Sequence, residues 1–96
     1  PQMNPQEMAK RQTDAIKERV KLSDDQFKQV FDINLKSSEE TMKILSGGRR
    51  DMEALTKINN KKDSLIKCTL TPEQIKLYDE YLKERREARR AQGLNR

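Results

Sequence analysis

Few residues in this 96-residue chain could perform catalysis, because it contains no histidine and only one cysteine, Cys68. A thiol is a weak nucleophile unless a neighbouring base activates it, and histidine is the usual base. The acidic residues alternate with basic ones, as in surface ion pairs, rather than standing among the apolar residues that typically surround a general acid or base. We therefore expect no enzymatic activity, no cofactor and no dedicated zinc, nickel or copper site.

Sulfur chemistry is limited as well. The four methionines, Met3, Met8, Met42 and Met52, do not cluster in the sequence. We therefore interpret Met42 and Met52 as adaptable packing and contact residues rather than as soft-metal ligands. Cys68 lies in the string SLIKCTL at the end of an expected helix, where a small, half-buried packing residue would fit. The alternative is a disulfide to a second copy of the chain, which an oxidising compartment would permit.

Positive charge is the chemistry that the chain offers in quantity. It has 21 lysines and arginines against 16 acidic residues, a formal net charge of +5 and a pI near 9.5. Residues 1–46 hold eight basic and eight acidic side chains, so the whole excess lies in residues 47–96. We predict that an unfolded or acidic partner is attracted by cations early in this half and then contacted by the two methionines. The selected residues are Arg49, Arg50, Lys57, Lys61 and Lys62, with Met42 and Met52.

A second basic cluster lies near the C-terminus, where glutamates separate the cations. It consists of Lys83, Arg85, Arg86, Arg89 and Arg90, interspersed with Glu80, Glu84 and Glu87. For either cluster the simpler interpretation is a solvated helix surface, and cations at the end of a helix also suit its dipole.

Nucleic acid binding is a rival interpretation of a basic helical protein, because phosphate contacts supply most non-specific affinity. The sequence has no helix-turn-helix spacing, no histidine for a zinc finger and no aromatic, glycine-rich strand pair typical of an RNA-binding sheet. We therefore expect no nucleic acid partner.

Two related five-residue strings, LSDDQ at 22–26 and LTPEQ at 70–74, predict where helices begin. In each, the hydroxyl residue can cap the helix by accepting a hydrogen bond from a first-turn amide, while the glutamine reaches back to the cap's own amide. The leucine before the cap can pack on an apolar residue of the first turn. The motif residues are Leu22, Ser23 and Gln26 in the first string and Leu70, Thr71 and Gln74 in the second.

Apolar residues recur at helical spacing through four segments, which predicts a single all-α domain over residues 1–96. We expect helices at about 5–20, 24–46, 50–67 and 72–91, with the second and third forming a long hairpin. Gly47 and Gly48 would end the second helix as a C-terminal cap. Asn34, Ser38 and Thr41 interrupt its apolar stripe, so we expect that stretch to face a shallow groove or water.

The chain is poor in material for a core, because 32% of it is hydrophobic, 39% is charged and there is no tryptophan. A domain of this size with so few apolar residues is marginal alone unless a second surface completes it. We therefore predict a homodimer. No segment is long and apolar enough to span a membrane.

The paired L-[ST]-x-x-Q strings resemble the LTxxQ-motif family of bacterial periplasmic proteins, the Spy/CpxP-like family. The resemblance rests on the two motifs and on helical organisation over roughly residues 5 to 90, although the hairpin is shorter here. It implies a Spy/CpxP-like four-helix fold, a periplasmic location after removal of a signal peptide, and a role in the stress response. The implied function is ATP-independent, chaperone-like binding of unfolded or acidic clients. The alternative is a regulator that docks on the sensor domain of an envelope-stress kinase.

Overall fold

The computed structural model describes residues 4–47 and 51–94, which form four α-helices and contain no strand. The helices are α1 (Pro5–Val20), α2 (Asp24–Ser46), α3 (Met52–Cys68) and α4 (Pro72–Leu94). The prediction of an all-α, four-helix fold is thus confirmed. The third helix begins at Met52 rather than near residue 50, because the side chain of Asp51 accepts a hydrogen bond from the amide of Ala54 and caps it.

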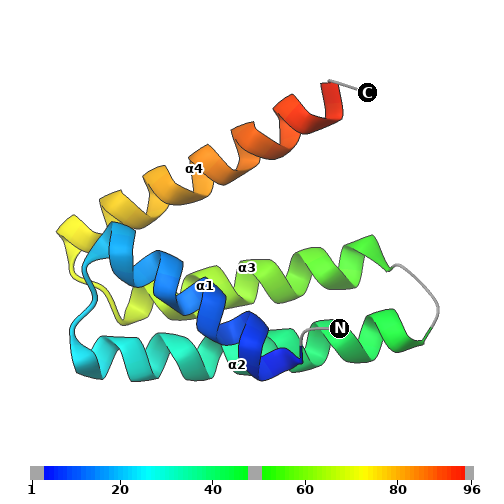
Figure 1. The fold of residues 1–96 in the computed structure, drawn as a ribbon, viewed down its shortest axis with the longest axis horizontal. Coiled ribbons are helices and arrows are strands. Elements are labelled where there is room, and N and C mark those ends of the chain that lie inside the picture. The colour runs from blue at the N-terminus through cyan, green and yellow to red at the C-terminus, as the bar shows by residue number, and fades with distance from the viewer. Residues whose placement is uncertain (1–3, 48–50, 95–96) are drawn as a thin grey trace.

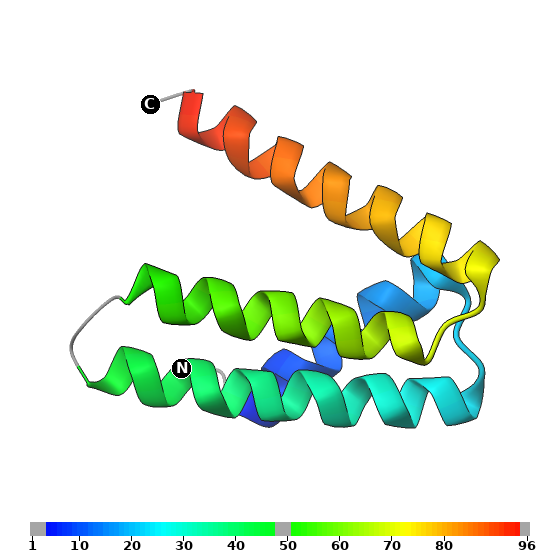
Figure 2. The ribbon, with the colours of Figure 1, turned by 180° about the vertical axis from the view of Figure 1, so that it is seen from behind.

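The helices are arranged as an antiparallel pair with two further helices laid against one end. α2 and α3 lie side by side, α1 packs on α2, and α4 packs on α1 (Figures 1 and 2). α4 begins beside the end of α3 and then diverges from it, so the two helices form a V (Figures 1 and 2). Within the two described ranges, no helix is long and apolar enough to cross a membrane.

Both capping boxes are present, at the starts of α2 and α4. The hydroxyl oxygen of Ser23 accepts from the amide of Gln26 at 3.2 Å, and the Gln26 side chain accepts from the Ser23 amide at 2.9 Å. The same pair of bonds joins Thr71 and Gln74, at 3.2 Å and 3.0 Å. The two strings are therefore used in the same way.

The two motif glutamines also bind each other. Each side-chain amide donates to the other's oxygen, at 2.7 Å from Gln26 and 3.0 Å from Gln74. Each amide nitrogen donates in addition to a backbone carbonyl of the opposite turn, Gln26 to Thr69 at 3.0 Å and Gln74 to Lys21 at 3.2 Å. Since Lys21 and Thr69 both lie two residues before their caps, the contact is close to two-fold symmetric.

The turn after α1 contains the one non-glycine residue with positive φ among those described, Lys21 at φ 60°. In this left-handed conformation its amide donates to the carbonyl of Lys17 at 2.8 Å and ends the helix. At the end of α2, by contrast, Gly47 has φ −73°, so it does not act as a left-handed glycine cap. The prediction that the helix ends at Gly47 is nevertheless confirmed, because Gly47 is its C-cap and donates its amide to the carbonyl of Ile44. Gly48 lies outside the described residues.

The apolar core lies at the motif end of the molecule. It joins the ends of α1 and α3 to the first two turns of α2 and α4, and Leu70 packs against it. Its buried members are Ile16, Val20, Leu22, Val30, Ile66 and Tyr78. The four helix ends that meet at the two motif turns therefore share one core, and burial of these side chains is the main term that stabilises their junction.

Farther from the motifs, the contact between α1 and α2 is polar. Asn34 is fully buried and donates to the hydroxyl of Thr13 at 2.9 Å, and this hydroxyl donates to the carbonyl of Ala9 at 2.6 Å. Ser38 is buried as well. The expectation that this stretch faces a groove or water was wrong for Asn34, whose side chain is buried against Thr13 of α1. It is confirmed for Ser38 and Thr41, which line a small hollow of about 110 Å³.

Cys68 is exposed at the end of α3, so its predicted role as a half-buried packing residue was also wrong. It is the last residue of α3. Among the described residues of that helix, the one fully buried side chain is Ile66. Residues two positions apart lie on roughly opposite sides of an α-helix, so the side chain of Cys68 points away from the core that Ile66 faces.

The glutamine pair yields a test of the junction. We expect Gln26→Ala or Gln74→Ala to lower the free energy of unfolding by about 2 kcal/mol, because each removes both hydrogen bonds between the glutamines and deprives one cap amide and one backbone carbonyl of a partner. The double variant should lose at least about 1 kcal/mol less than the sum of the single losses, because the two side chains share a network. Urea unfolding followed by circular dichroism measures these values.

The exposed Gln29 on α2 provides a matched control. Gln29→Ala should stay within about 0.5 kcal/mol of the parent. Strictly additive losses for Gln26 and Gln74 would contradict the coupling.

Candidate functional site

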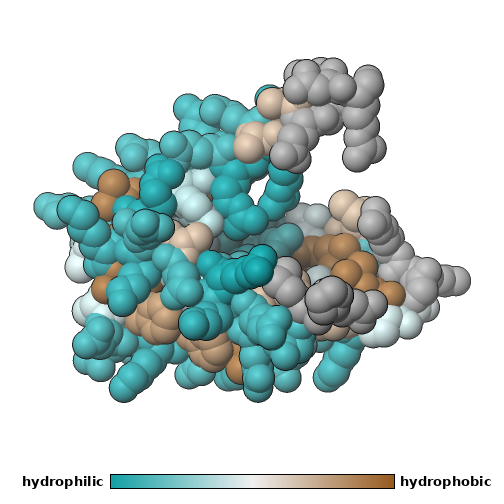
Figure 3. Space-filling model, viewed as in Figure 1, coloured by the Kyte–Doolittle hydropathy of each residue, from teal (hydrophilic) through white to brown (hydrophobic). Residues whose placement is uncertain are grey.

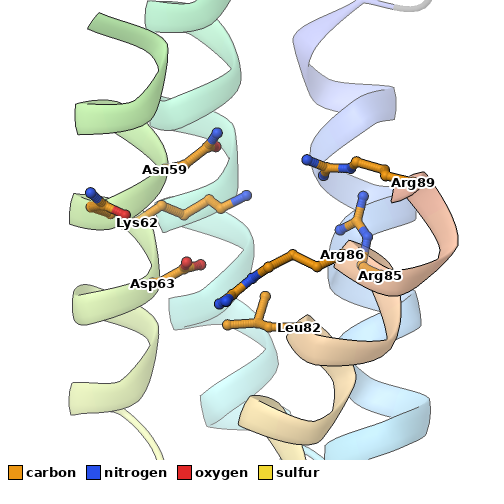
Figure 4. A pocket seen from close by; sticks show the side chains of 8 residues that line it. Asn59, Lys62, Asp63, Leu82, Arg85, Arg86 and Arg89 are labelled. Carbon is orange, nitrogen blue, oxygen red and sulfur yellow. The ribbon is translucent and has the colours of Figure 1, made fainter. Parts of the chain in front are cut away.

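The V between α3 and α4 encloses a basic cleft of about 410 Å³. Figure 4 shows side chains of α3 on one side and arginines of α4 on the other, facing the space between them. The lining consists of Asn59, Asn60, Lys62, Asp63, Leu82, Arg85, Arg86 and Arg89. We call Lys62, Arg85, Arg86 and Arg89 the cleft cations.

Two polar contacts hold the base of the cleft together. The hydroxyl of Tyr78, a buried residue of α4, donates to the carboxylate of Asp63 on α3 at 2.8 Å. One turn away, Lys67 and Asp79 form an ion pair at 2.8 Å. These contacts fix the start of α4 against the end of α3, and the cleft opens beyond them.

The upper part of α4 is held by α1 instead. Arg19, in the last turn of α1, pairs with Glu84, and its guanidinium lies 5.9 Å from the ring centre of Tyr81. The guanidinium of Arg85 lies 5.7 Å from the centre of the same ring. Tyr81 therefore has one cation from α1 and one from α4 near its ring, and both can be attracted to the ring's π-electrons. The contact with Tyr81 helps to hold Arg85 at the wall of the cleft.

The cleft cations are not balanced by acidic partners. Among the residues that the structure describes, none of the four forms an ion pair. The one carboxylate in the lining, Asp63, already accepts the hydrogen bond from Tyr78. The Lys62 ammonium is also partly removed from water: burial lowers its pKa, the charges of Arg85 and Arg89 add to this effect, and Asp63 opposes it.

The five cations selected from the sequence do not form one surface. Lys62 lines the cleft, whereas its neighbour Lys61 lines a groove between α2 and α3. Lys57 is exposed, 3.9 Å from Glu53. Arg49 and Arg50 lie outside the described residues.

The sequence did not indicate that the second basic cluster joins Lys62. The cations of residues 83–90 were visible as a cluster at the end of the last helix, and helical spacing already places Arg85 and Arg89 on one side of it. What could not be predicted was the angle between α3 and α4, because it depends on contacts between distant residues.

Apolar side chains are exposed along the α2–α3 pair. Met52 is 65% exposed, Leu45 47% and Leu65 44%, whereas Met42 is half-buried. The groove that contains Lys61 has a volume of about 230 Å³ and includes Ile33, Ile58 and Leu65 in its lining. We call Leu45, Met52 and Leu65, together with this groove, the α2–α3 surface.

The space-filling view shows the same mixture on the face of Figure 1. Hydrophobic residues emerge between hydrophilic ones over α2 and α3, rather than in one continuous patch (Figure 3). A further hollow near α1 is lined by the half-buried rings of Phe27 and Phe31 together with Lys10 and Lys28. Apolar surface is therefore bordered by charged side chains of both signs in two separate places.

These features define a small, basic, four-helix protein with an open cleft and a partly apolar surface. Residues 1–93 match the family model described as Domain of unknown function (DUF4890), and the chain belongs to that family. No curated protein and no solved structure matches it. The resemblance to LTxxQ-motif proteins thus stays an inference from the two motifs.

The contact between Tyr78 and Asp63 predicts a dependence of stability on pH. Tyr78→Phe should lower the free energy of unfolding by about 1 to 2 kcal/mol at neutral pH, because Asp63 loses a donor. Burial raises the pKa of Tyr78 well above its ordinary value of 10.0, and the charge and hydrogen bond of Asp63 raise it further. Above about pH 10 unfolding therefore releases a proton, so the advantage of the parent over Tyr78→Phe should shrink as pH rises.

Urea unfolding at about pH 8 and about pH 11 checks this prediction. Tyr81→Phe is the matched control, because no hydrogen bond from the Tyr81 hydroxyl occurs in the described part of the chain, and it should cost less than about 0.5 kcal/mol at neutral pH. A difference between parent and Tyr78→Phe that stays the same at both pH values would show that the phenol is not held in its protonated form.

Proposed function

We propose that the protein is an ATP-independent, chaperone-like protein that binds unfolded clients on the α2–α3 surface and attracts acidic clients through its positive charge. The observation that carries this proposal is the exposure of Leu45, Met52 and Leu65 on two adjacent helices, with Leu65 in a groove that charged side chains also line. Exposed apolar side chains bordered by polar ones are typical of surfaces that bind other proteins.

The exposed residues are only partly buried by the fold itself. Leu45 and Met52 lie at the ends of α2 and α3 that are remote from the apolar core, and Leu65 lies beside the groove. Full burial of such a side chain contributes about 1.5 to 3 kcal/mol, so contact with an unfolded client can recover free energy that folding leaves unused.

The proposed mechanism has two steps and needs no covalent chemistry. The net charge of +5 increases the rate of encounter with an acidic client, an effect that salt would screen. Apolar contact then slows dissociation, and unbranched methionine side chains can adapt to different clients.

The paired capping boxes support the Spy/CpxP-like part of the proposal. Both L-[ST]-x-x-Q strings begin helices in the same way, and their glutamines join the two turns. A periplasmic location and a role in the stress response follow from this resemblance alone and belong to the proposal.

A regulator that docks on an envelope-stress sensor kinase is the second candidate. The concentration of unpaired cations in one cleft favours it, because a single defined site suits one acidic partner better than many unfolded ones. Such a regulator should bind one partner saturably and with strong salt dependence, whereas a chaperone should protect several unrelated proteins.

An aggregation assay tests the chaperone proposal. The parent should suppress aggregation of several unrelated unfolded proteins at near-stoichiometric ratios. A variant with Leu45→Gln, Met52→Gln and Leu65→Gln should lose most of this effect while keeping its helicity, because all three side chains are exposed and glutamine favours helix.

Leu77→Gln is the control, because Leu77 is 38% exposed on α4 and outside the α2–α3 surface. It should protect clients like the parent. Equal protection by the triple variant, or no protection by the parent, would reject the proposal and favour a dedicated partner.

A homodimer also belongs to the proposal. The apolar core occupies only one end of the molecule, so a single chain buries little apolar surface and a second copy would add to it. Sedimentation equilibrium at micromolar concentration should give twice the chain mass of 11.3 kDa. The melting temperature should rise with protein concentration, because association stabilises the folded chain. A monomer whose melting temperature does not depend on concentration would contradict this part.

A further inference from the structure

We propose that the cleft between α3 and α4 binds a compact, phosphate-bearing ligand through the four cleft cations. This site is separate from the α2–α3 surface, and the inference does not depend on the proposed chaperone function. It rests on charge, on the placement of the cations and on the remaining groups of the cleft.

The first argument is the charge that the cleft concentrates. Four cations and one carboxylate line a space of about 410 Å³, and that carboxylate, Asp63, is engaged by Tyr78. The Lys62 ammonium is partly buried and lies near the guanidiniums of Arg85 and Arg89, an arrangement that is unfavourable unless an anion is bound. The lowered pKa of Lys62 reflects this burial and repulsion. A phosphate group carries up to two negative charges and offsets this repulsion better than one carboxylate does.

The second argument is geometry. Arg85 and Arg89 are separated by four residues, so they lie on one side of α4 about 6 Å apart along its axis. Lys62 faces them from α3 across the cleft (Figure 4). A tetrahedral phosphate presents oxygens in several directions and can accept from both walls at once, with guanidiniums binding it in bidentate fashion.

The third argument concerns the size of the ligand. Glu80, Glu84 and Glu87 alternate with the cations along α4, so positive charge does not form a continuous track beyond the cleft. A nucleic acid or another polyanion needs such a track to neutralise successive phosphates. The volume of the cleft falls instead in the range of small-ligand sites.

The remaining lining suggests how the rest of the ligand lies. Asp63 repels an anion at the base of the cleft and can accept a hydrogen bond from a hydroxyl or amine. Leu82 offers an apolar contact beside it, and Asn59 offers an amide. The phosphate would therefore lie toward Arg89 and the rest of the ligand toward Leu82, an arrangement that suits both a soluble phosphate ester and a lipid headgroup.

Isothermal titration with pyrophosphate at constant ionic strength tests the site. The parent should bind it saturably, and a variant with Arg85→Gln and Arg89→Gln should bind at least about tenfold more weakly. The control carries Lys83→Gln and Arg90→Gln, which remove the same charge from the same helix outside the cleft lining. Its affinity should stay within about threefold of the parent, and circular dichroism should show equal helicity in all three proteins.

Flotation with vesicles containing phosphatidic acid distinguishes the source of the phosphate. Binding to these vesicles that is lost in the Arg85/Arg89 variant would assign a lipid headgroup, whereas binding of soluble pyrophosphate alone would assign a free phosphate compound. An octaglutamate peptide serves as the competing carboxylate probe. Tighter binding of the peptide, equal losses in the cleft and control variants, or binding of neither phosphate probe would overturn the inference.

Discussion

The junction of the four helices depends on the reciprocal amide contact between Gln26 and Gln74 together with the apolar core beside it. Each glutamine begins its own helix and at the same time binds the turn that precedes the other helix, so four helix ends are joined by two side chains. The apolar core occupies the same end of the molecule, and water is excluded from the side chains beside the amide pair. Because the low dielectric of such surroundings strengthens hydrogen bonds, the polar contact and the apolar core stabilise each other.

This arrangement explains how a chain with so little apolar material is organised. The core is placed where all four helices meet, and the more distant contact of α1 with α2 uses Thr13, Asn34 and Ser38 instead of large side chains. The divergence of α4 from α3 follows, because α4 is held by α3 near Tyr78 and by α1 near Glu84. The basic cleft is thus a consequence of how α4 is anchored, and its cations belong to two helices that share few contacts.

Features that depend on neighbours three or four residues apart could be predicted from the sequence. The helix starts at Ser23 and Thr71 are examples, because capping acts within one turn. The contact of Gln26 with Gln74 could not be predicted, since 48 residues separate them and any polar side chain would serve a glutamine equally well. Asn34 was misjudged for a related reason: its polarity indicates water unless a partner such as Thr13 on another helix is known. Lys62 and Arg89 join in one cleft only through the angle between their helices.

The uneven distribution of packing has a mechanical consequence. Near the motif turns, displacement of any helix disturbs buried side chains from all the others, so this end resists deformation. At the far ends of α2 and α3, where Leu45 and Met52 are exposed, displacement breaks few contacts and requires little work. The molecule is therefore stiff at the motif turns and more easily deformed at the opposite end, where the connected ends of α2 and α3 shift together rather than apart.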